Sequence, residues 1–332
     1  MERQYIGVDL HKQFFQACAV RPSGERLWEQ KFPRTEGGIV LFQACCHDAT
    51  AIAVEACGPT WAFVDALGST VGTVCVVDPR KTRLKAGFAA KTDRLDARRL
   101  ADALRRESVV SVYVPAPAIR EVREVCRGRH HVIRLRTRLA QMIRALLFRS
   151  GVADVPVRRV FSPRGLTWLE TVSLPADAAA SLARYHRVLM AIQAAAADAV
   201  VTARAAADPI ALALDAMVGI GPVLALTIRA EVGDIARFRR GAELASYAGL
   251  VPRVDASADR YWSGRITREG SPWLRWALVE AAMHAIHRQD AVGRWARQLA
   301  VRKGTFKARV ALARRLCDDI VAAWPREGTI RA

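Results

Sequence analysis

Four acidic residues lie where a metal site could be built. Asp9 ends an apolar run in the string YIGVDLHK, and Glu55 ends another in AIAVEACG. Asp93 and Asp96, in KTDRLDARRLA, are three residues apart and therefore share one face of a helix. Carboxylates that converge on one cavity repel one another and lose hydration, and bound divalent cations offset both costs. Mg²⁺ prefers oxygen ligands, and a pair of such ions clamps the attacking and leaving oxygens of a phosphoryl transfer.

Each acid taken alone has a plainer explanation. A single carboxylate is more often a surface ion pair or a helix cap, and Asp93 at a helix start fits a cap. The four acids together, in the order strand, strand, helix, favour a shared site instead. His11, two residues after Asp9, either lines this site or, as is more common, has a peripheral role. The sequence therefore predicts a two-metal phosphoryl-transfer site at Asp9, Glu55, Asp93 and Asp96.

The elements that would position these acids form an α/β pattern over residues 1–115. Short apolar or alternating runs predict strands, and 3.6-residue patterns predict helices. The predicted strands are Tyr5–Leu10, Phe14–Val20, Leu27–Phe32, Ala51–Val54 and Val71–Val77. The predicted helices are Glu36–Cys46, Thr60–Leu67 and Thr92–Arg106, the last with Thr92 as its N-cap. Strands first and strand–helix alternation afterwards predict a mixed sheet covered by helices.

From about residue 118 the pattern becomes helical. A long helix has an apolar face with Val125, Val132, Leu139 and Leu146 at intervals of seven, and with Leu135 and Met142 between them. An alanine-rich helix follows, with 3/4 spacing from Leu182 to Ala203. The two helices fit a hairpin within one chain and an intermolecular coiled coil equally well.

Asp208-Pro209 begins a third region. The string MVGIGPVLA places two glycines between helices, as a helix-hairpin-helix does to bring backbone N–H groups against a phosphate, and as a plain glycine turn also would. Residues 233–275 are rich in Gly, Arg and Ser and are expected to form loops around short helices. From Trp273 the pattern is helical to the end.

Composition points to a polyanionic partner. The 332 residues contain 51 Lys+Arg and 32 Asp+Glu, a formal net charge of +19, and their 52% hydrophobic content can form two or three domains. No apolar run is expected to be long enough to span a bilayer, and the charged N-terminus does not resemble a signal peptide. Seven cysteines without CxxC spacing are typical of reduced thiols in a cytosol.

The ordered strings resemble one protein family over nearly the whole chain. GVDLHK, VEACG and KTDRLDARRLA are similar to the N-terminal domain of the insertion-sequence-110 transposase family. GIGPVLALTIRAEVGD, RFRRGAELASYAGLVPR and SGRITREGSPWLRWALVEAA are similar to its C-terminal transposase domain. The resemblance implies an RNase H-like, RuvC-type N-terminal domain, a helical coiled-coil-like middle, and a mainly α C-terminal domain with the helix-hairpin-helix-like motif. The expected boundaries are 1–118, 119–206 and 207–332.

The resemblance also implies a mechanism. It makes Asp9, Glu55, Asp93 and Asp96 a DEDD set that binds Mg²⁺, and it makes Ser271, in REGSPWLR, a nucleophile that forms a covalent 5′-phosphoserine link to DNA. Without the resemblance, Ser271 before Pro272 is more simply a helix N-cap. The family further implies a non-coding bridge RNA that pairs with donor and target DNA, and a bacterial protein acting in the cytoplasm at the nucleoid.

Three basic segments are the candidate nucleic-acid contacts: the stretch 80–85, the Arg-rich helix over 120–149, and the C-terminal Lys/Arg face. The expected contact residues are Arg80, Lys81, Arg83, Lys85, Arg134, Arg138, Arg265, Arg268, Arg275, Lys303 and Lys307. Trp262, Trp273, Trp276 and Trp295 lie near these charges and are expected to be core residues rather than base-stacking platforms.

Two other functions fit parts of the pattern. A RuvC-like endonuclease would hydrolyse DNA with metal-activated water and leave Ser271 unused. A catalytically inactive protein would keep the fold and bind nucleic acid only. Recombination involves four DNA strands, so we expect a homodimer or tetramer, and the sequence does not reveal whether Ser271 meets the acids within one chain or between chains.

Overall fold

The structure, a computed structural model, describes residues 2–68, 71–78, 81–82, 92–152, 155, 160–195, 198–257 and 260–325, and within these the side chains of 198–199 and 254–263 are not described. The chain divides into two compact units, Met1–Pro115 and Ala116–Ala332. Each unit is described by itself.

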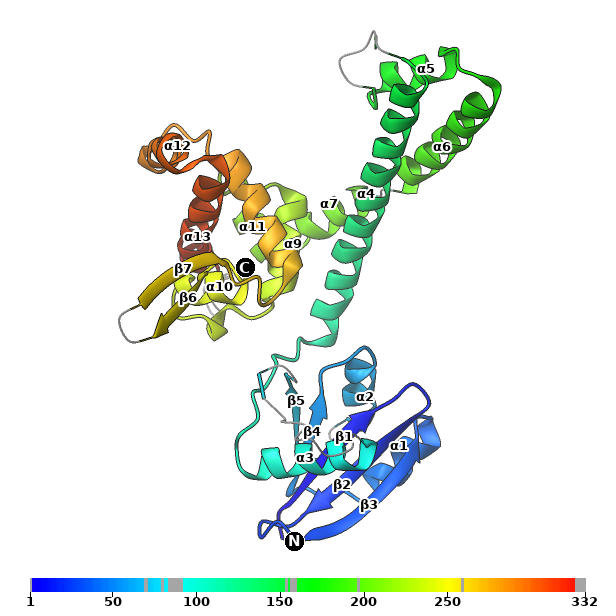
Figure 1. Cartoon of the computed structure of the whole chain (residues 1–332). Helices are drawn as coiled ribbons and strands as arrows, with labels where there is room; N and C mark the ends of the chain where they lie inside the picture. Colours follow the sequence, from blue (N-terminus) through cyan, green and yellow to red (C-terminus); the bar gives the residue numbers. More distant parts are fainter. Residues whose placement is uncertain are drawn as a thin grey trace. The chain divides into compact units, whose positions relative to one another are not determined.

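The first unit contains a five-stranded mixed sheet and three helices (Figure 1). The strands are β1 Gln4–Leu10, β2 Phe14–Val20, β3 Arg26–Pro33, β4 Thr50–Glu55 and β5 Thr73–Val77, and the helices are α1 Glu36–Gln43, α2 Thr60–Leu67 and α3 Asp93–Arg105. The strand order is β3-β2-β1-β4-β5, with β1, β2 and β3 antiparallel and with β4 and β5 parallel to β1. The predicted mixed sheet and its three helices are confirmed.

Both faces of this sheet are covered, because successive strand residues point to opposite sides. In β2, Phe15 packs with Phe42 of α1 and Phe63 of α2, at ring-centroid distances of 5.3 and 5.0 Å. On the other face Cys18 and Val20 pack with Ala97 and Ala101 of α3. The sheet is therefore the middle of three layers, with α1 and α2 on one side and α3 on the other.

Gly7 allows α3 to lie directly against β1. A Cβ atom at Gly7 would lie 2.0 Å from the Ala97 carbonyl oxygen and 2.4 Å from the Ala101 nitrogen, closer than any side chain tolerates. The helix begins where predicted, because the Thr92 side chain accepts a hydrogen bond from the Leu95 N–H at 3.3 Å. Strand β1 and the start of α3 are thus held at a fixed separation.

The second unit is mainly helical. Its first part contains α4 Pro117–Arg149, α5 Pro163–Thr171, α6 Ala176–Ala195 and α7 Asp198–Ala206. Its second part contains α8 Pro209–Asp215, α9 Pro222–Val232, a 3-10 turn Ile235–Arg237, α10 Gly241–Tyr247, the strands β6 Pro252–Ser257 and β7 Arg260–Ile266, α11 Pro272–Ala285, α12 Ala291–Lys303 and α13 Thr305–Ala323.

The long helix α4 forms a hairpin with α6 within the chain. Leu139, Ile143 and Leu147 of α4 are buried against Leu182 and Leu189 of α6. The predicted heptad face is only partly right, because Leu135 and Met142 are 56% and 40% exposed. A straight helix has 3.6 residues per turn, so the buried stripe drifts away from a strict interval of seven.

The C-terminal part packs around α9 and α11. Every residue from Leu224 to Val232 is buried except Arg229, and α11 buries six residues against the same core. The expectation of loops over 233–275 is wrong at β6 and β7, which form an antiparallel hairpin. Its Arg, Ser and Gly residues carry no apolar alternation, so the strand pattern is not visible in the sequence.

One apolar stretch is longer than expected. Residues 176–206 are long and apolar enough to cross a bilayer by length and composition, so the expectation that no such run exists is wrong. Alanine supplies much of this hydropathy, and a core helix of a soluble protein passes the same test. In α6, Leu182 and Leu189 are buried within the helical hairpin, whereas Val188 and Met190 are exposed.

Candidate active site

Asp9 and Glu55 lie side by side at the carboxyl ends of neighbouring strands. Strands β1 and β4 are parallel, with Val8 paired to Val54, so the next residue of each strand is an acid at the same edge. Carboxyl ends of parallel strands are where sheets of this kind place their ligands. The strand register thus accounts for the spacing of the first two predicted acids.

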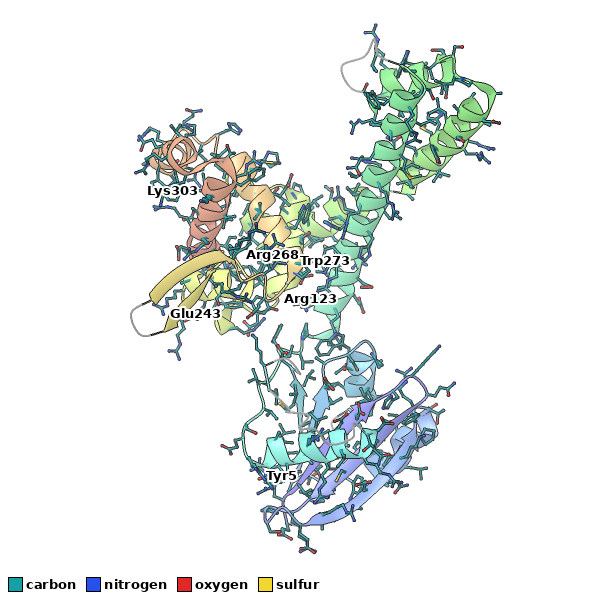
Figure 2. The ribbon with its side chains drawn as sticks, in the orientation of Figure 1. Tyr5, Arg123, Glu243, Arg268, Trp273 and Lys303 are labelled. Carbon is teal, nitrogen blue, oxygen red and sulfur yellow. The ribbon has the colours of Figure 1, made fainter. Side chains whose placement is uncertain are left out.

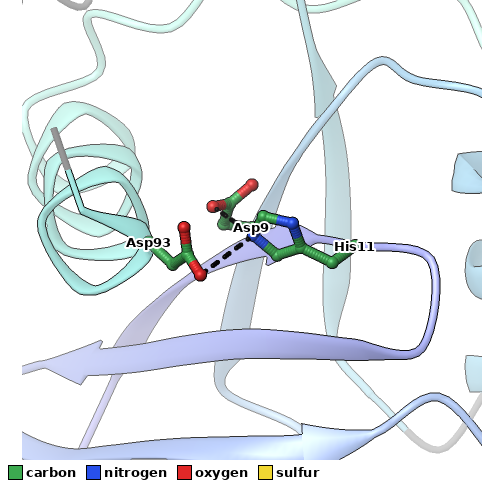
Figure 3. Close-up of side chains that lie close together, drawn as sticks. All are labelled: Asp9, His11 and Asp93. Carbon is green, nitrogen blue, oxygen red and sulfur yellow. Dashed lines mark hydrogen bonds and ion pairs between the residues drawn. The ribbon is translucent and has the colours of Figure 1, made fainter.

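Asp93 reaches this edge from the first turn of α3 (Figure 3). The Nε2 atom of His11 lies 3.2 Å from Asp9 Oδ2 and 3.3 Å from Asp93 Oδ2. One ligand atom from each of these three residues lies within 4.8 Å of the other two. The expectation of a peripheral His11 is therefore wrong: the imidazole bridges two of the predicted acids.

The fourth acid, Asp96, lies one helical turn after Asp93. Its Oδ1 atom accepts a hydrogen bond from Arg99 Nη1 at 3.2 Å. Burial raises the pKa of Asp9, the His11 ring opposes this, and the charges of Asp93 and Asp96 raise the pKa further. Burial is thus the main cause of the raised pKa of Asp9, and the charges of Asp93 and Asp96 add to it.

These residues fit a divalent cation. Carboxylate oxygens are the ligands that Mg²⁺ and similar hard cations prefer, and a cation would offset the burial and the repulsion that raise the pKa of Asp9. Asp93 also lines an open groove of about 510 Å³, together with Gln16, Gln30 and Lys31. Two further lining residues, Glu29 and Arg94, form an ion pair at 3.3 Å.

Ser271 lies in the second unit, at the N-terminus of α11. Its Oγ accepts a hydrogen bond from the Leu274 N–H at 3.2 Å, so the predicted N-cap is confirmed. The same Oγ donates a hydrogen bond to Glu231 Oε2 at 2.8 Å. The hydroxyl therefore has a carboxylate partner that capping does not require.

Glu231 was not recognised from the sequence. It lies in the last turn of α9, its side chain is 2% exposed, and Arg127 of α4 donates to both of its carboxylate oxygens at 2.8 and 3.0 Å. Arg123, labelled in Figure 2, donates to the carbonyl oxygens of Ala230 and Glu231 at 2.7 and 2.8 Å. The sequence signal that could have revealed Glu231 is that it is the one acid in the mainly apolar string PVLALTIRAEV.

The loop before Ser271 has a constrained backbone. Arg268 and Gly270 have φ of 57° and 93°, and a Cβ at Gly270 would lie 2.0 Å from the Tyr247 carbonyl oxygen. Arg275, one turn into α11, donates to the Ala248 carbonyl oxygen at 3.0 Å. Burial and the charge of Arg268 lower the pKa of Arg275, so an anion bound here would relieve an excess of positive charge.

Most of the predicted nucleic-acid contacts are accessible. Lys81, Arg134, Arg138, Arg265, Arg268, Lys303 and Lys307 are exposed, Arg275 is half-buried, and Arg80, Arg83 and Lys85 lie outside the described residues. Arg268 lies before α11 and Lys303 ends α12 (Figure 2). Exposure makes these cations available to phosphates, and their contacts with nucleic acid stay a prediction.

The tryptophans and the glycine turn have packing roles. Trp276 and Trp295 are partly buried against the C-terminal core, as predicted, and the His130 ring lies 4.7 Å from the rings of Trp273 and Trp276. The side chain of Trp262 lies outside the described residues. Gly219 has φ of 94°, and a Cβ there would lie 2.6 Å from the Ala281 carbonyl oxygen, so close packing against α11 accounts for this glycine.

Comparison with known proteins identifies similar proteins for both parts of the chain. A family model described as "Transposase IS116/IS110/IS902 family" matches residues 211–297, and a DEDD transposase model of the IS110 group matches residues 6–150. The chain is 28% identical to a probable family 20 transposase of Pseudomonas aeruginosa, over 100% of this chain and 99% of that protein. It is 27% identical to the transposase for insertion sequence element IS1111A of Coxiella burnetii, over 98% of this chain and 91% of that protein.

The DEDD match covers the unit that carries the four acids, and a DEDD transposase domain implies an RNase H-like fold and the use of a divalent metal. The second match covers Glu231 and Ser271. Both halves of the chain thus lead to the same family, and the protein is a DNA-processing enzyme of an insertion element: it belongs to the IS110/IS116/IS902 family of DEDD transposases.

Proposed function

We propose that this transposase cleaves and rejoins DNA through a covalent phosphoserine intermediate at Ser271, with Mg²⁺ held by Asp9, Glu55, Asp93 and Asp96. The observation that carries the metal-dependent part is the approach of Asp9 and Asp93 to a common point at the carboxyl edge of a sheet. Bound Mg²⁺ would supply Lewis-acid polarisation of the phosphoryl oxygens. The position of the bound Mg²⁺ would be determined by the four acids, which lie on β1, β4 and α3.

Ser271 is the proposed nucleophile. The N-cap position fixes the hydroxyl at the head of a helix, where the helix dipole favours a phosphate. Arg268 and Arg275 add positive charge beside it, which supports binding of a scissile phosphate. Attack by Oγ would leave a 5′-phosphoserine and a free 3′ hydroxyl, and the reverse attack would reseal the strand. The phosphoester retains the bond energy that rejoining needs.

A guide RNA and an oligomer complete the proposal. We propose that a bridge RNA pairs with donor and target DNA, while the basic residues of the chain contact its backbone and that of the DNA. A RuvC-type N-terminal domain, a coiled-coil-like segment over 119–206 and a C-terminal domain with a helix-hairpin-helix-like motif would act as a homodimer or tetramer. Its site of action would be the bacterial nucleoid.

Substitution of Ser271 and Asp9 tests the mechanism. Ser271→Ala should abolish strand cleavage and the covalent protein–DNA species, while Ser271→Asn serves as a control that keeps a capping side chain and should be equally inactive. Asp9→Asn should abolish cleavage as well. The measurement is strand cleavage and protein-linked DNA on denaturing gels, with DNA from the ends of the protein's own element.

The alternatives give different results in this assay. Full cleavage by Ser271→Ala would identify a nuclease that uses water. Activity that is unchanged in Asp9→Asn would contradict the metal site, and absence of activity in the unsubstituted protein would identify a binding protein only. Sequencing the RNA that copurifies tests guidance: we expect one structured RNA encoded beside the gene, and a random RNA population would contradict it.

A further inference from the structure

We infer that Glu231 is the proton acceptor of Ser271 and that Arg127 positions it, so that the second unit carries its own Ser–Glu–Arg catalytic group. This inference rests on the proposed function, because it assigns a role in the serine attack. The distance that supports it is the 2.8 Å between Ser271 Oγ and Glu231 Oε2. A candidate base must lie within hydrogen-bond reach of the proton it removes, and Glu231 does.

The hydrogen bonds of Ser271 leave one position for an electrophile. A serine hydroxyl has one donor hydrogen and two acceptor lone pairs. The hydrogen is directed to Glu231, and one lone pair accepts the Leu274 N–H at 3.2 Å. The second lone pair is the nucleophilic one. An N-cap role alone would use only the acceptor side and would leave the direction of the hydroxyl hydrogen undefined.

The charge of Glu231 is unnecessary for packing. A buried carboxylate loses its hydration, and an apolar or amide residue of similar size would fill the same place at lower cost. Arg127 offsets this loss by donating to both carboxylate oxygens, and Arg123 donates to the last carbonyl groups of α9. Helices α4, α9 and α11 thus hold Oε2 against the serine hydroxyl. This geometry is fixed before any DNA is bound.

The proton transfer balances in both directions. In cleavage, Ser271 Oγ attacks the scissile phosphorus, its O–H bond breaks, and the proton passes to Glu231 Oε2. The new Oγ–P bond replaces the P–O3′ bond, and the departing 3′ oxygen takes a proton from water. In rejoining, a 3′ hydroxyl attacks the phosphoserine and gives its proton to water, the Oγ–P bond breaks, and Glu231 returns its proton to Ser271.

The test compares Glu231→Gln and Glu231→Asp with the unsubstituted protein. The full-length protein is copurified with nucleic acid from cells carrying its element, and the probe is a 3′-labelled duplex that spans one end of that element and its flank. Glu231→Gln preserves size but cannot accept the proton, so adduct formation should slow by about 100-fold or more. Glu231→Asp retains the charge opposite Arg127 but is one methylene shorter, and should slow it by about tenfold or more.

Three further measurements separate chemistry from structure. Affinity for the probe should stay unchanged in both variants, because only the rate of attack depends on the proton acceptor. Adduct formation by Glu231→Gln should increase more steeply with pH than that of the unsubstituted protein, because hydroxide then replaces the missing base. Glu280→Gln, on the helix that Ser271 caps and 36% exposed at its side chain, is the matched control and should behave as the unsubstituted protein.

Each outcome has one meaning. If Glu231→Gln and Glu231→Asp form the adduct at the normal rate, Glu231 has no part in the attack, although the proposed serine mechanism stands. If the unsubstituted protein cleaves its probe without any adduct, the serine mechanism fails and the role of Glu231 fails with it. If Glu231→Gln does not fold, Glu231→Asp decides, because it keeps the ion pair with Arg127.

Discussion

Asp9 is the acid of the candidate site whose pKa is raised. Its pKa is raised by burial first and by the charges of Asp93 and Asp96 next, while His11 lowers it. A raised pKa means that the folded chain binds this proton more tightly than the unfolded chain does. The contribution of Asp9 to stability is therefore most favourable below its ordinary pKa and is lost as pH rises through the raised value. A cation bound at the site would restore the stability that is lost when Asp9 ionises.

The first prediction concerns Asp9→Asn. At neutral pH in EDTA this variant should unfold at a higher temperature than the unsubstituted protein, because a half-buried charge that His11 offsets only in part is removed. Added Mg²⁺ should stabilise the unsubstituted protein and leave the variant unchanged. Thermal unfolding monitored by circular dichroism measures both effects. Asp48→Asn, an exposed acid of the same unit, is the control; equal stabilisation of Asp9→Asn by Mg²⁺ would contradict the metal site.

The second prediction concerns the pH dependence of metal binding. Because the pKa of Asp9 is raised, Asp9 releases its proton at a higher pH than an ordinary aspartate. Affinity for Mn²⁺, a spectroscopic substitute for Mg²⁺, should therefore fall as pH decreases through the raised pKa, before ordinary carboxylates are protonated. Electron paramagnetic resonance of free Mn²⁺ measures this affinity. An affinity that stays constant until the ordinary aspartate range would show that Asp9 is not a ligand.

At the same scale, the sequence pointed to some residues of the candidate site and not to others, for physical reasons. The sequence pointed to four acids, Asp9, Glu55, Asp93 and Asp96, because each lies near the beginning or end of an element. An acid at such a position interrupts the residue pattern and can be recognised in the sequence. Glu231 lies inside an apolar helix, and its partner Arg127 precedes it by 104 residues. Only folding brings the two together, so spacing along the chain could not reveal that ion pair.

At the scale of elements, the alternation of residue types was sufficient to predict the strands of the first unit. Strand β2 was predicted over its observed range, Phe14–Val20, because its side chains alternate between two buried faces. The hairpin β6–β7 was missed, because its strands, PRVDAS and RYWSGRI, lack such alternation. Helix α5 was not predicted, because its nine residues, PRGLTWLET, are short and include Pro and Gly.

The third prediction tests how closely α3 must lie against β1. Gly7→Ala would place a methyl group 2.0 Å from the Ala97 carbonyl oxygen, so α3 must shift, and Asp93 and Asp96 must shift with it. We expect a loss of about 1–3 kcal/mol in the free energy of unfolding, the usual cost of overpacking, together with weaker Mg²⁺ stabilisation. Urea unfolding with and without Mg²⁺ measures both quantities.

Gly37→Ala is the matched control for that substitution. Gly37 lies in α1, and a Cβ there meets no atom within 4 Å. Alanine should stabilise this helix by about 0.5–1 kcal/mol, because glycine loses more backbone freedom on folding. The two glycine-to-alanine substitutions are thus expected to change stability in opposite directions. A stable Gly7→Ala protein with normal Mg²⁺ stabilisation would show that α3 does not set the position of its acids.

At the scale of the whole molecule, charge is the dominant feature. A net charge of +19 over 332 residues attracts any polyanion, so affinity for nucleic acid alone does not identify a partner. The salt dependence is more informative, because each phosphate neutralised by a lysine or arginine contributes about 0.9 to the slope of log K against log salt concentration for duplex DNA. Each lysine or arginine that contacts a phosphate should therefore, when it is replaced by a neutral residue, reduce that slope by about 0.9.

The last prediction applies this count to Lys303 and Lys307, which are exposed at the junction of α12 and α13. If both contact phosphates, the double substitution to Gln should reduce the slope by about 2, to the same extent for any duplex sequence. The double substitution to Arg keeps the charge and should leave the slope unchanged. Fluorescence anisotropy of a labelled duplex over a range of KCl concentrations measures it. An unchanged slope in the Gln variant would mean that the C-terminal basic face is solvated and that the phosphates are bound elsewhere.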